Sequence, residues 1–305
     1  MSTTPRKLVI AGGTGLVGRA LVETLVAQGF EARVLTRNPG ALALPSGARA
    51  FGWEALDQAL EGAEALVNLA GEGIADRRWN PARKAALRTS RLDTTRRLVE
   101  ALGRAKDGPK VLVNASAVGY YGAHGGEVVD ETAPRGKGFL ADLCAAWEAE
   151  ADRASELGIR VVKLRIGVVL AREGGALPKM ALPVKLFQGA KLGHGQQGLS
   201  WIHLDDLVAM IQAAATDPAW SGVYNATAPK PVTNETFTRL LGRVLHRPIL
   251  PVPAFVTATV LPLLVGEMAE PMLLQGAFIY PRRAEAQGFT FTHPDAAGAL
   301  QDLIA

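Results

Sequence analysis

A glycine motif near the start of the sequence limits the folds available to this chain more than any other feature. Gly12, Gly15 and Gly18 follow the apolar run 8–11 and open an amphipathic stretch over 16–28. At such a junction the first glycine permits a tight turn, the second lets a pyrophosphate approach the backbone, and the third lets helix pack on strand. The helix N-terminus then offers N–H groups to the anion. The alternative is a flexible loop, since the chain has 33 glycines, but the position between strand and helix favours a dinucleotide site.

Short apolar runs alternate with helical patterns over the first 170 residues. Strands are expected at 8–11, 32–36, 49–51, 65–70, 110–115 and 160–170, and helices at 16–28, 54–60, 81–105 and 139–157. Nearly continuous apolar strands that alternate with helices predict a parallel sheet covered by helices on both faces. The expected fold class is therefore α/β, a Rossmann-type doubly wound parallel sheet.

The alternation ends near residue 170, where a stretch rich in Gly, Lys and Gln begins. Short strands at 200–202 and 223–225 enclose a helix at 205–215, and Thr233 is a plausible N-cap of a helix over 233–245. The apolar stretch 254–265 is too short to span a membrane and is expected to be a packed helix or part of a lid. We expect a nucleotide domain over 1–170, to which 200–226 returns, and a smaller C-terminal lid or substrate region formed by 171–199 and 227–305.

The composition limits the partners and the compartment. Of the 305 residues, 48% are hydrophobic and 20% are charged, which is typical of a globular chain. The net charge of +4 comes without a long basic run, so we expect no nucleic-acid partner, and the excess suits a small phosphate-bearing ligand. Cys144, the single cysteine, excludes an internal disulfide, and five scattered histidines show no metal-ligand spacing. We expect a cytoplasmic protein without a membrane segment, monomeric or homodimeric, with no metal.

The end of the second predicted strand indicates which dinucleotide binds. An NAD site usually places an acid there for the ribose hydroxyls, but this segment is Leu35-Thr36-Arg37-Asn38. The Arg37 guanidinium could pair with a 2′-phosphate through a charge-assisted fork, with Arg19 as a second cation. The alternative is that Arg37 is a solvated surface residue. We therefore expect NADP(H).

Several segments resemble the extended short-chain dehydrogenase/reductase family, in its nucleotide-sugar epimerase/dehydratase group. The likeness rests on the glycine motif and on 67–71, 116–122, 164–167 and 201–207, and it spans most of residues 7–226. A branch often labelled "epimerase family protein" is similar over nearly the whole chain. Its marks here are Asn68-Leu69-Ala70-Gly71-Glu72, Arg78-Trp79, Ser90-Arg91, 119–122, Cys144-x-x-Trp147-Glu148, 174–177, 200–203, 228–234 and a C-terminal segment within 266–289.

The resemblance implies which residues contact the cofactor. These residues lie in the glycine loop, at the end of the second strand, in the segment after the fourth strand and at the ends of later strands. They are Gly12, Thr14, Gly15, Leu16, Val17, Gly18, Arg37, Leu69, Ala70, Gly71, Glu72, Arg77, Ala115, Ile166, Gly167 and Val168. Glu72 could bond a ribose or act as a base, and Arg77 or Arg78 could hold an anionic group. The alternative for either arginine is a solvated helix end.

The catalytic residues of the wider family do not carry over to this chain. The Ser position falls on Ala117, with Ser116 adjacent, and the Tyr and Lys positions fall on Leu140 and Cys144. The Asn position falls on Arg91. The cofactor site is therefore expected to be intact while the usual Tyr-x-x-x-Lys pair is absent.

The remaining candidates for proton transfer lie after the fifth strand, on the edge that faces a ligand crevice. Ser116 and Tyr120 are the catalytic candidates, whereas Tyr121 is expected to pack structurally. Lys84 and Arg91 share one helix face, so one of them could replace the missing lysine charge. Cys144 is expected to be a small buried hydrophobe, and Trp147 and His203 are expected to be structural.

Two functions follow from these observations. The first is an NADP(H)-dependent oxidoreductase or epimerase-like enzyme acting on an unknown small molecule, either a nucleotide sugar or another carbonyl compound. The mechanism would be hydride transfer, with Ser116, Tyr120 or a water moving the proton. The second is a non-catalytic NADP(H)-binding redox sensor or regulatory protein, which the resemblance links to cell division through the labels of some relatives. The missing catalytic residues favour the second function, and the substrate-side lid favours the first.

Overall fold

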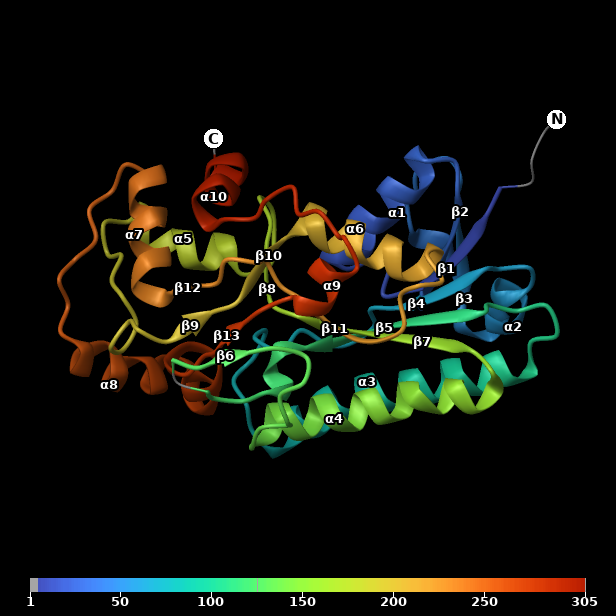
Figure 1. The fold of residues 1–305 in the computed structure, drawn as a ribbon, viewed down its shortest axis with the longest axis horizontal. Helices are drawn as coiled ribbons and strands as arrows, with labels where there is room; N and C mark the ends of the chain where they lie inside the picture. The colour runs from blue at the N-terminus through green and yellow to red at the C-terminus, as the bar shows by residue number, and fades with distance from the viewer. Residues whose placement is uncertain (1–4, 125, 305) are drawn as a thin grey trace.

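A seven-stranded sheet, parallel throughout, forms the centre of the computed structural model, which describes residues 5–124 and 126–304. The strand order is β11-β7-β5-β4-β1-β2-β3 (Figure 1). This arrangement confirms the Rossmann-type fold class. The strands are β1 Lys7–Ala11, β2 Glu31–Thr36, β3 Ala48–Gly52, β4 Ala65–Asn68, β5 Val111–Ala117, β7 Arg160–Ile166 and β11 Gly222–Ala226. The chain builds outward from β1 in both directions, so a crevice opens at the carboxyl ends of β1 and β4. Residues 1–4 of the predicted nucleotide domain, together with 125 and 305, lie outside the described residues.

Helices cover both faces of this sheet (Figure 1). Alternate residues of β1 point to opposite faces, so Leu8 and Ile10 pack against one layer and Val9 and Ala11 against the other. The first layer contains α1 Leu16–Ala27 and α6 Leu204–Thr216. The second contains α2 Leu56–Leu60, α3 Pro81–Arg104 and α4 Phe139–Asp152. Burial on both faces explains why the strands are almost continuously apolar in the sequence.

The glycine motif allows three backbone segments to meet at the end of β1. Gly12 has a φ of +83°, and a Cβ there would lie 2.7 Å from the backbone carbon of Leu69. A Cβ on Gly18 would lie 2.2 Å from the Gly12 carbonyl oxygen. Both distances are shorter than any normal carbon contact, so glycine is required at both positions for the turn and for helix packing.

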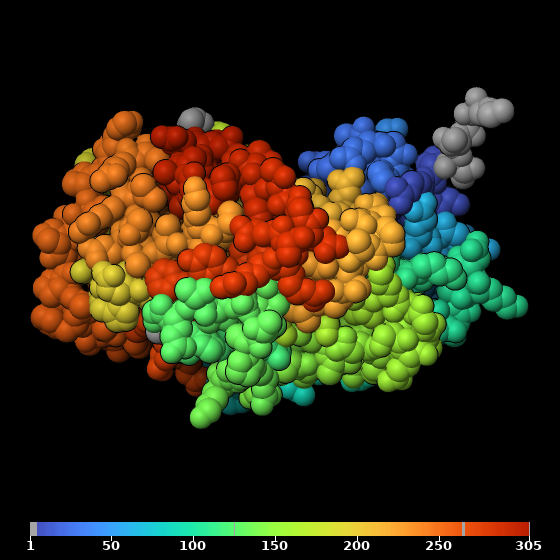
Figure 2. Space-filling model, viewed as in Figure 1, coloured from blue at the N-terminus to red at the C-terminus, as the bar shows by residue number. Residues whose placement is uncertain are grey.

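The lid lies at the carboxyl end of the sheet and has its own apolar core (Figure 1). Its helices are α5 Leu177–Lys185, α7 Asn234–Val244, α8 Ala254–Val265 and α10 Ala296–Ile304, whereas α9 Arg282–Ala286 packs against β11 and buries Ala284 in the core of the central sheet. Three two-stranded pairs lie beside the sheet. β9 Gly198–Leu199 pairs with β12 Val232–Thr233 within the lid, β13 Phe278–Ile279 of the lid pairs with β6 Val128–Val129, and β8 Val168–Leu170 pairs with β10 Trp201–His203. Figure 2 shows the C-terminal segment lying across the molecule, in contact with elements from both halves.

Two sequence expectations need correction. The strand predicted over 160–170 is two strands, β7 and β8, because the chain leaves the sheet at Gly167 and pairs with β10 instead. The helix predicted from residue 54 begins as a 3₁₀ turn, Trp53–Ala55, before α2. The stretch 254–265, expected to be a packed helix or part of a lid, is the helix α8 of the lid, and its Phe255 and Leu263 are 71% and 70% exposed. The predicted N-cap is confirmed, since the Thr233 hydroxyl accepts the Thr236 N–H. No helix in the described part of the chain is long and apolar enough to cross a membrane.

The start of α6 clasps the C-terminal segment. Asp206, which is 1% exposed, accepts the backbone N–H groups of Thr292 and His293 at 2.7 and 3.0 Å. The buried His203 caps α6 by accepting the Asp205 N–H through Nδ1, and its ring stacks on His293 at 3.7 Å. On its other side His203 Nε2 lies 3.3 Å from a carboxylate oxygen of Asp302 on α10. Burial, with a smaller contribution from His293, lowers the pKa of His203.

This clasp predicts a loss of stability in mild acid. Because the folded-state pKa of His203 is below its unfolded value, the unfolded chain takes up the proton first as the pH falls. The free energy of unfolding should therefore decrease as the pH falls below about 6.5. Urea unfolding at several pH values measures this slope. His203→Asn keeps an N-cap acceptor without the titration, so the slope should become shallower in that variant. Equal slopes in both proteins would contradict the assignment.

Candidate functional site

The structure brings the predicted cofactor residues to one edge of the sheet. Ala11, Asn68 and Asn114 lie in register on β1, β4 and β5. Gly12, Leu69 and Ala115 therefore come next along three adjacent strands. Ile166 is the last residue of β7, with Gly167 and Val168 immediately after it. The carboxyl edge of a parallel sheet is where ligands of this fold bind.

The N-terminus of α1 is suited to an anion. Gly15 is its N-cap, and among the described residues no side chain caps the helix and no acid lies in its first turn. The first N–H groups and the positive end of the helix dipole are thus available to a phosphate. Gly15 differs from Gly12 and Gly18, because the nearest atom to a Cβ there is 3.4 Å away. A Cβ at Gly15 would therefore be in ordinary van der Waals contact with the Gly12 carbonyl oxygen, so the space at Gly15 does not itself require glycine, and its exposed backbone can be approached by a ligand.

Arg37 is an exposed cation near this edge. It directly follows β2, which pairs with β1, and its side chain has no hydrogen bond or ion pair within the described residues. Arg19, on the first turns of α1, is likewise exposed. Both positions leave a guanidinium available for an added phosphate, which is consistent with the NADP(H) prediction.

A buried polar network, which the sequence did not reveal, supports the turn after β4. The Asn68 amide donates to Thr95 Oγ1 at 2.9 Å and to Asn114 Oδ1 at 2.7 Å. Its oxygen accepts the Ala70 N–H at 3.2 Å. All three side chains are fully buried. Since buried amides must be hydrogen-bonded, this network fixes the backbone at Leu69 and Ala70 beside the glycine loop.

Ser116 is held by a buried ion pair beneath the crevice. Its hydroxyl donates to Glu148 Oε1 at 2.7 Å. Arg165 binds the same carboxylate through two hydrogen bonds, from Nε at 2.8 Å and from Nη2 at 2.9 Å. Glu148 and Arg165 are 5% and 4% exposed. Although burial opposes it, the hydrogen bond to Glu148 and its charge raise the pKa of Arg165. In this arrangement the Ser116 hydroxyl is directed at Glu148.

Tyr121 and Tyr120 differ in their surroundings. The Tyr121 hydroxyl accepts from Arg165 Nη1 at 2.9 Å and donates to Asn225 at 2.7 Å. Tyr121 is fully buried, and burial raises its pKa to about 12. Its predicted structural role is confirmed. Tyr120 is only half-buried, and the Arg165 guanidinium carbon lies 3.3 Å from the centre of its ring. The Tyr120 hydroxyl has no hydrogen-bond partner within the described residues, so it is free to meet a ligand.

Cys144, at the expected lysine position, is a buried thiol. It is 3% exposed, and burial raises its pKa to about 11, with the Glu148 charge acting in the same direction. The thiol therefore stays protonated at neutral pH and cannot supply the positive charge of a lysine. Trp147 lies in the core, as predicted.

The segment after β4 is attached to α3 by arginines. Glu72 forms an ion pair with Arg83, which also donates to the Gly73 carbonyl at 2.6 Å. Arg91 donates to the carbonyls of Glu72 at 3.0 Å and Leu87 at 3.2 Å. Burial lowers the pKa of Arg91. The structure thus directs Glu72 at Arg83, a residue that the sequence had not singled out. Arg77 is exposed at the mouth of the crevice.

Two cations, one in the segment after β4 and one at the start of α3, connect this part of the molecule to the end of α8. Arg78 donates to the Leu263 carbonyl at 2.9 Å. Lys84 forms an ion pair with Glu267, which lies in the turn after α8. The predicted role of Arg78 in holding an anion therefore competes with a backbone contact, and Lys84 is part of a connection between the two halves of the molecule.

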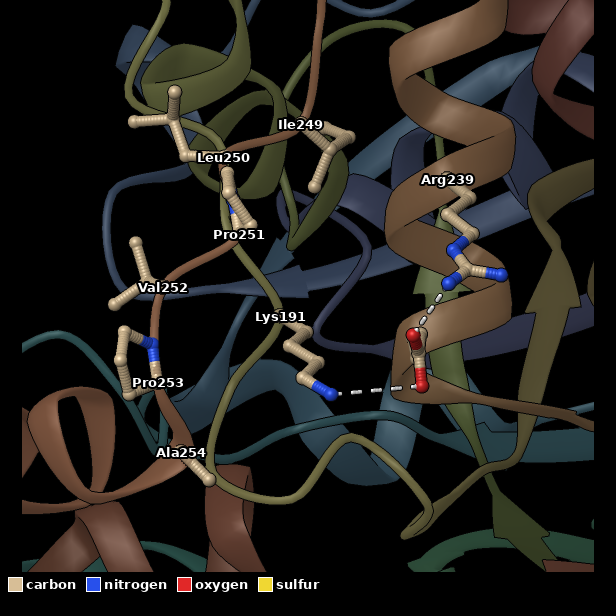
Figure 3. A pocket seen from close by; sticks show the side chains of 9 residues that line it. Lys191, Arg239, Ile249, Leu250, Pro251, Val252, Pro253 and Ala254 are labelled. Carbon is tan, nitrogen blue, oxygen red and sulfur yellow. Dashed lines mark hydrogen bonds and ion pairs between the residues drawn. The ribbon is translucent and has the colours of Figure 1, made fainter.

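A separate pocket of about 410 Å³ lies within the lid. Its basic wall consists of Lys191 and Arg239, which both reach Glu235, at 3.8 and 2.7 Å (Figure 3). The opposite wall is apolar and is formed by 249–254. None of its lining residues belongs to the glycine motif or to the β5 edge, so it is not part of the dinucleotide site.

His203, Asp205 and His293 present ligand atoms within 4.8 Å of one another, although the histidine spacing gave no such signal. The geometry favours a structural role. His203 Nδ1 already accepts the Asp205 N–H, and the cluster lies at the positive end of α6, which disfavours a cation.

Comparison with known proteins gives consistent matches over the whole chain. The model of the NAD dependent epimerase/dehydratase family matches residues 8–226, and that of a domain of unknown function (DUF1731) matches 252–303. The chloroplastic SDR39U1 homolog of Arabidopsis thaliana, named an epimerase family protein, is 40% identical over 97% of this chain and 86% of its own length. The Bacillus subtilis epimerase family protein YfhF is 37% identical, with 98% of each covered. The human epimerase family protein SDR39U1, crystallised with NADPH, has a TM-score of 0.87 at 35% identity, covering 98% of this chain and 99% of that one.

The buried ion pair predicts a strong dependence of stability on Glu148. In Glu148→Gln the Arg165 charge stays buried without its counter-charge, so the free energy of unfolding should fall by about 3 kcal/mol. Replacing both residues, as Glu148→Gln with Arg165→Met, removes the uncompensated charge and should recover part of that loss. Urea denaturation of the wild type, both single variants and the double variant measures the coupling. Strict additivity of the two single changes would contradict the assignment.

Proposed function

Because the chain belongs to the NAD-dependent epimerase/dehydratase family, with the short-chain dehydrogenase/reductase fold, we propose that it is an NADP(H)-dependent oxidoreductase or epimerase-like enzyme. The observation that carries the proposal is the uncapped N-terminus of α1, together with the exposed Arg37, which has no partner in the part of the chain that the structure describes. The NADPH in the crystal structure of the human relative, 35% identical to this chain, supports the choice of cofactor.

The residues present fit a dinucleotide phosphate. The glycine loop leaves Gly15 exposed, and there the pyrophosphate would meet the α1 N–H groups. Arg37 would hold the 2′-phosphate through a charge-assisted fork. The ends of β4, β5 and β7 would face the nicotinamide half, and when bound the cofactor supplies a hydride. The remaining contacts are those implied by the family resemblance, including Leu69, Ala70, Gly71 and Gly167.

Tyr120 is the proposed proton donor on this edge. Its hydroxyl is free of protein partners, whereas the Ser116 hydroxyl donates to Glu148 and the Tyr121 hydroxyl donates to Asn225. The cation of Arg165 over its ring would stabilise negative charge on the phenolic oxygen after proton transfer. Ser116 remains a second candidate only if Glu148 releases it.

A second function, NADP(H) binding without turnover as a redox sensor or regulator, has one observation in its favour. The side chains at the family's catalytic positions, Leu140, Cys144 and Arg91, provide neither the acid nor the lysine of the usual mechanism. Under this alternative the nucleotide would bind with the same contacts, but no carbonyl compound would oxidise it.

The cofactor preference can be tested at Arg37. Replacing it with Ala should weaken NADPH binding by about 10- to 100-fold, as expected for the loss of a charge-assisted contact to a phosphate, and should leave NADH binding unchanged. Isothermal titration calorimetry with both nucleotides measures this. Arg49→Ala, an exposed arginine near the amino end of β3, is the matched control and should change neither affinity. Tighter binding of NADH than of NADPH by the wild type would exclude the assignment.

The proposal that the protein is an enzyme with Tyr120 as its proton donor can be tested by mutation. Once a substrate is identified, Tyr120→Phe should lower kcat by about 100-fold, since it removes the proton donor. NADPH affinity should stay the same, because the ring and its stacking on Arg165 are retained. Loss of NADPH absorbance reports turnover. Full activity of the variant would remove Tyr120 from the mechanism, and tight NADPH binding with no oxidation across a broad carbonyl panel would favour the sensor.

A further inference from the structure

Apolar side chains from both halves of the molecule meet at the carboxyl edge beside β5. Residues at the ends of three strands, namely Leu69, Ala115 and Ile166, pack in one cluster with residues from α3, α4 and the C-terminal region. The members from outside the sheet include Trp79, Phe139, Leu140, Met268 and Met272. The same strand ends are those proposed to face the nicotinamide, so this cluster borders the position of the reacting carbon.

The C-terminal residues of this cluster, Met268 and Met272, have flexible side chains and lie in short turns. Met268 ends a 3₁₀ turn, Gly266–Met268, and Met272 lies in a single π-helical turn, Glu270–Leu274. Single π-helical turns occur frequently at functional sites. Methionine side chains are flexible and polarisable, so they can repack around ligands of differing shape. Met268 is 8% exposed, whereas Met272 is half-buried and can yield more easily.

The other wall of the cluster is aromatic. The rings of Trp79 and Phe139 pack edge to face, with centroids 5.2 Å apart. Lys84 Nζ lies 6.0 Å from the first ring and 5.6 Å from the second. An apolar or aromatic group placed against these rings and the two methionines would gain contact area without leaving a polar group unpaired.

Four cations around this mouth are already committed to protein acceptors, whereas Arg77 is exposed. Arg78 donates to Leu263, Lys84 pairs with Glu267, and Arg91 donates to two carbonyl groups. Arg83 is held by Glu72 and Gly73. A diphosphate ligand needs charged donors that are free to turn toward it, and these four side chains would each have to break an existing contact to provide one.

We propose that the substrate of this site is an uncharged, apolar carbonyl compound, and not a nucleotide sugar, with its apolar part held against Met272, Met268 and Trp79. The inference rests on the proposed NADP(H)-dependent function. In the reduction the carbonyl carbon gains a hydride from NADPH and the carbonyl oxygen gains a proton from the Tyr120 hydroxyl, which solvent reprotonates. The products are the alcohol and NADP⁺.

The experiment uses the full chain, first titrated with NADPH. Benzylacetone, cinnamaldehyde and decanal are then compared with UDP-glucose and dTDP-glucose, with NADPH absorbance reporting turnover and calorimetry reporting binding to the NADPH complex. The expected result is binding and NADPH oxidation with at least one apolar carbonyl compound, and no binding of either nucleotide sugar in the calorimeter.

Three variants locate the apolar contact. Met272→Gln should weaken binding of the apolar compound by about tenfold, as expected when an amide replaces an apolar wall, while Met272→Leu should stay within about twofold because it conserves apolar volume. Leu250→Gln, in the apolar wall of the lid pocket, is the matched control and should have no effect. NADPH affinity should be the same in all three.

Several outcomes would overturn the inference. One is tighter binding of a nucleotide sugar than of any apolar carbonyl compound. Another is a loss of affinity in Leu250→Gln but not in Met272→Gln, which would place the compound in the lid pocket. NADPH binding without binding of any apolar compound would refute the substrate class while leaving the cofactor site standing. Failure to bind NADPH at all would instead refute the proposed function on which it rests.

Discussion

The close approach of three backbone segments at Gly12 is the constraint on which the rest of the molecule depends. The turn after β1, the first turn of α1 and the turn after β4 meet where any side chain would collide, with a prospective Cβ only 2.7 Å from Leu69. This approach leaves the N-terminus of α1 exposed at the carboxyl edge of the sheet. The Asn68–Asn114–Thr95 network then fixes the neighbouring turn, because its buried amides have no other way to satisfy their hydrogen bonds.

A second constraint is the buried group of polar side chains at the end of β5. Glu148 gathers Ser116 and Arg165 into one buried group, and Arg165 extends that group to Tyr121 and to the ring of Tyr120. The result is a rigid group in which the Tyr120 hydroxyl has no hydrogen-bond partner among residues 5–124 and 126–304. The positions that align with the Tyr and Lys of the wider family hold Leu140 and Cys144 here, so Tyr120 is the phenol of this group that is placed to exchange a proton with a ligand.

Much of the fold could be predicted from the sequence, because buried parallel strands and the glycine motif leave local signals. The β1 to β5 strands and the Thr233 cap are examples. The partners of Ser116 could not be predicted, since Glu148 and Arg165 lie 32 and 49 positions further along the chain and meet only through burial. The exposure of α8 could not be predicted for the opposite reason: its composition is that of a core helix, and only the tertiary structure shows that its surface is uncovered. The position of Met268 and Met272 beside the strand ends likewise could not be predicted, because they lie in short turns without a periodic apolar pattern.

The C-terminal segment has a consequence for the order in which the molecule can assemble. It supplies β13, which pairs with β6, it accepts a hydrogen bond from Asn225 through the Tyr280 carbonyl, and it is held at Thr292 and His293 by Asp206. Its partners are synthesised 50 to 150 positions earlier, as the sequence order of β6 and Asn225 requires. During translation the sheet can therefore form before the C-terminal segment is available to pack against it.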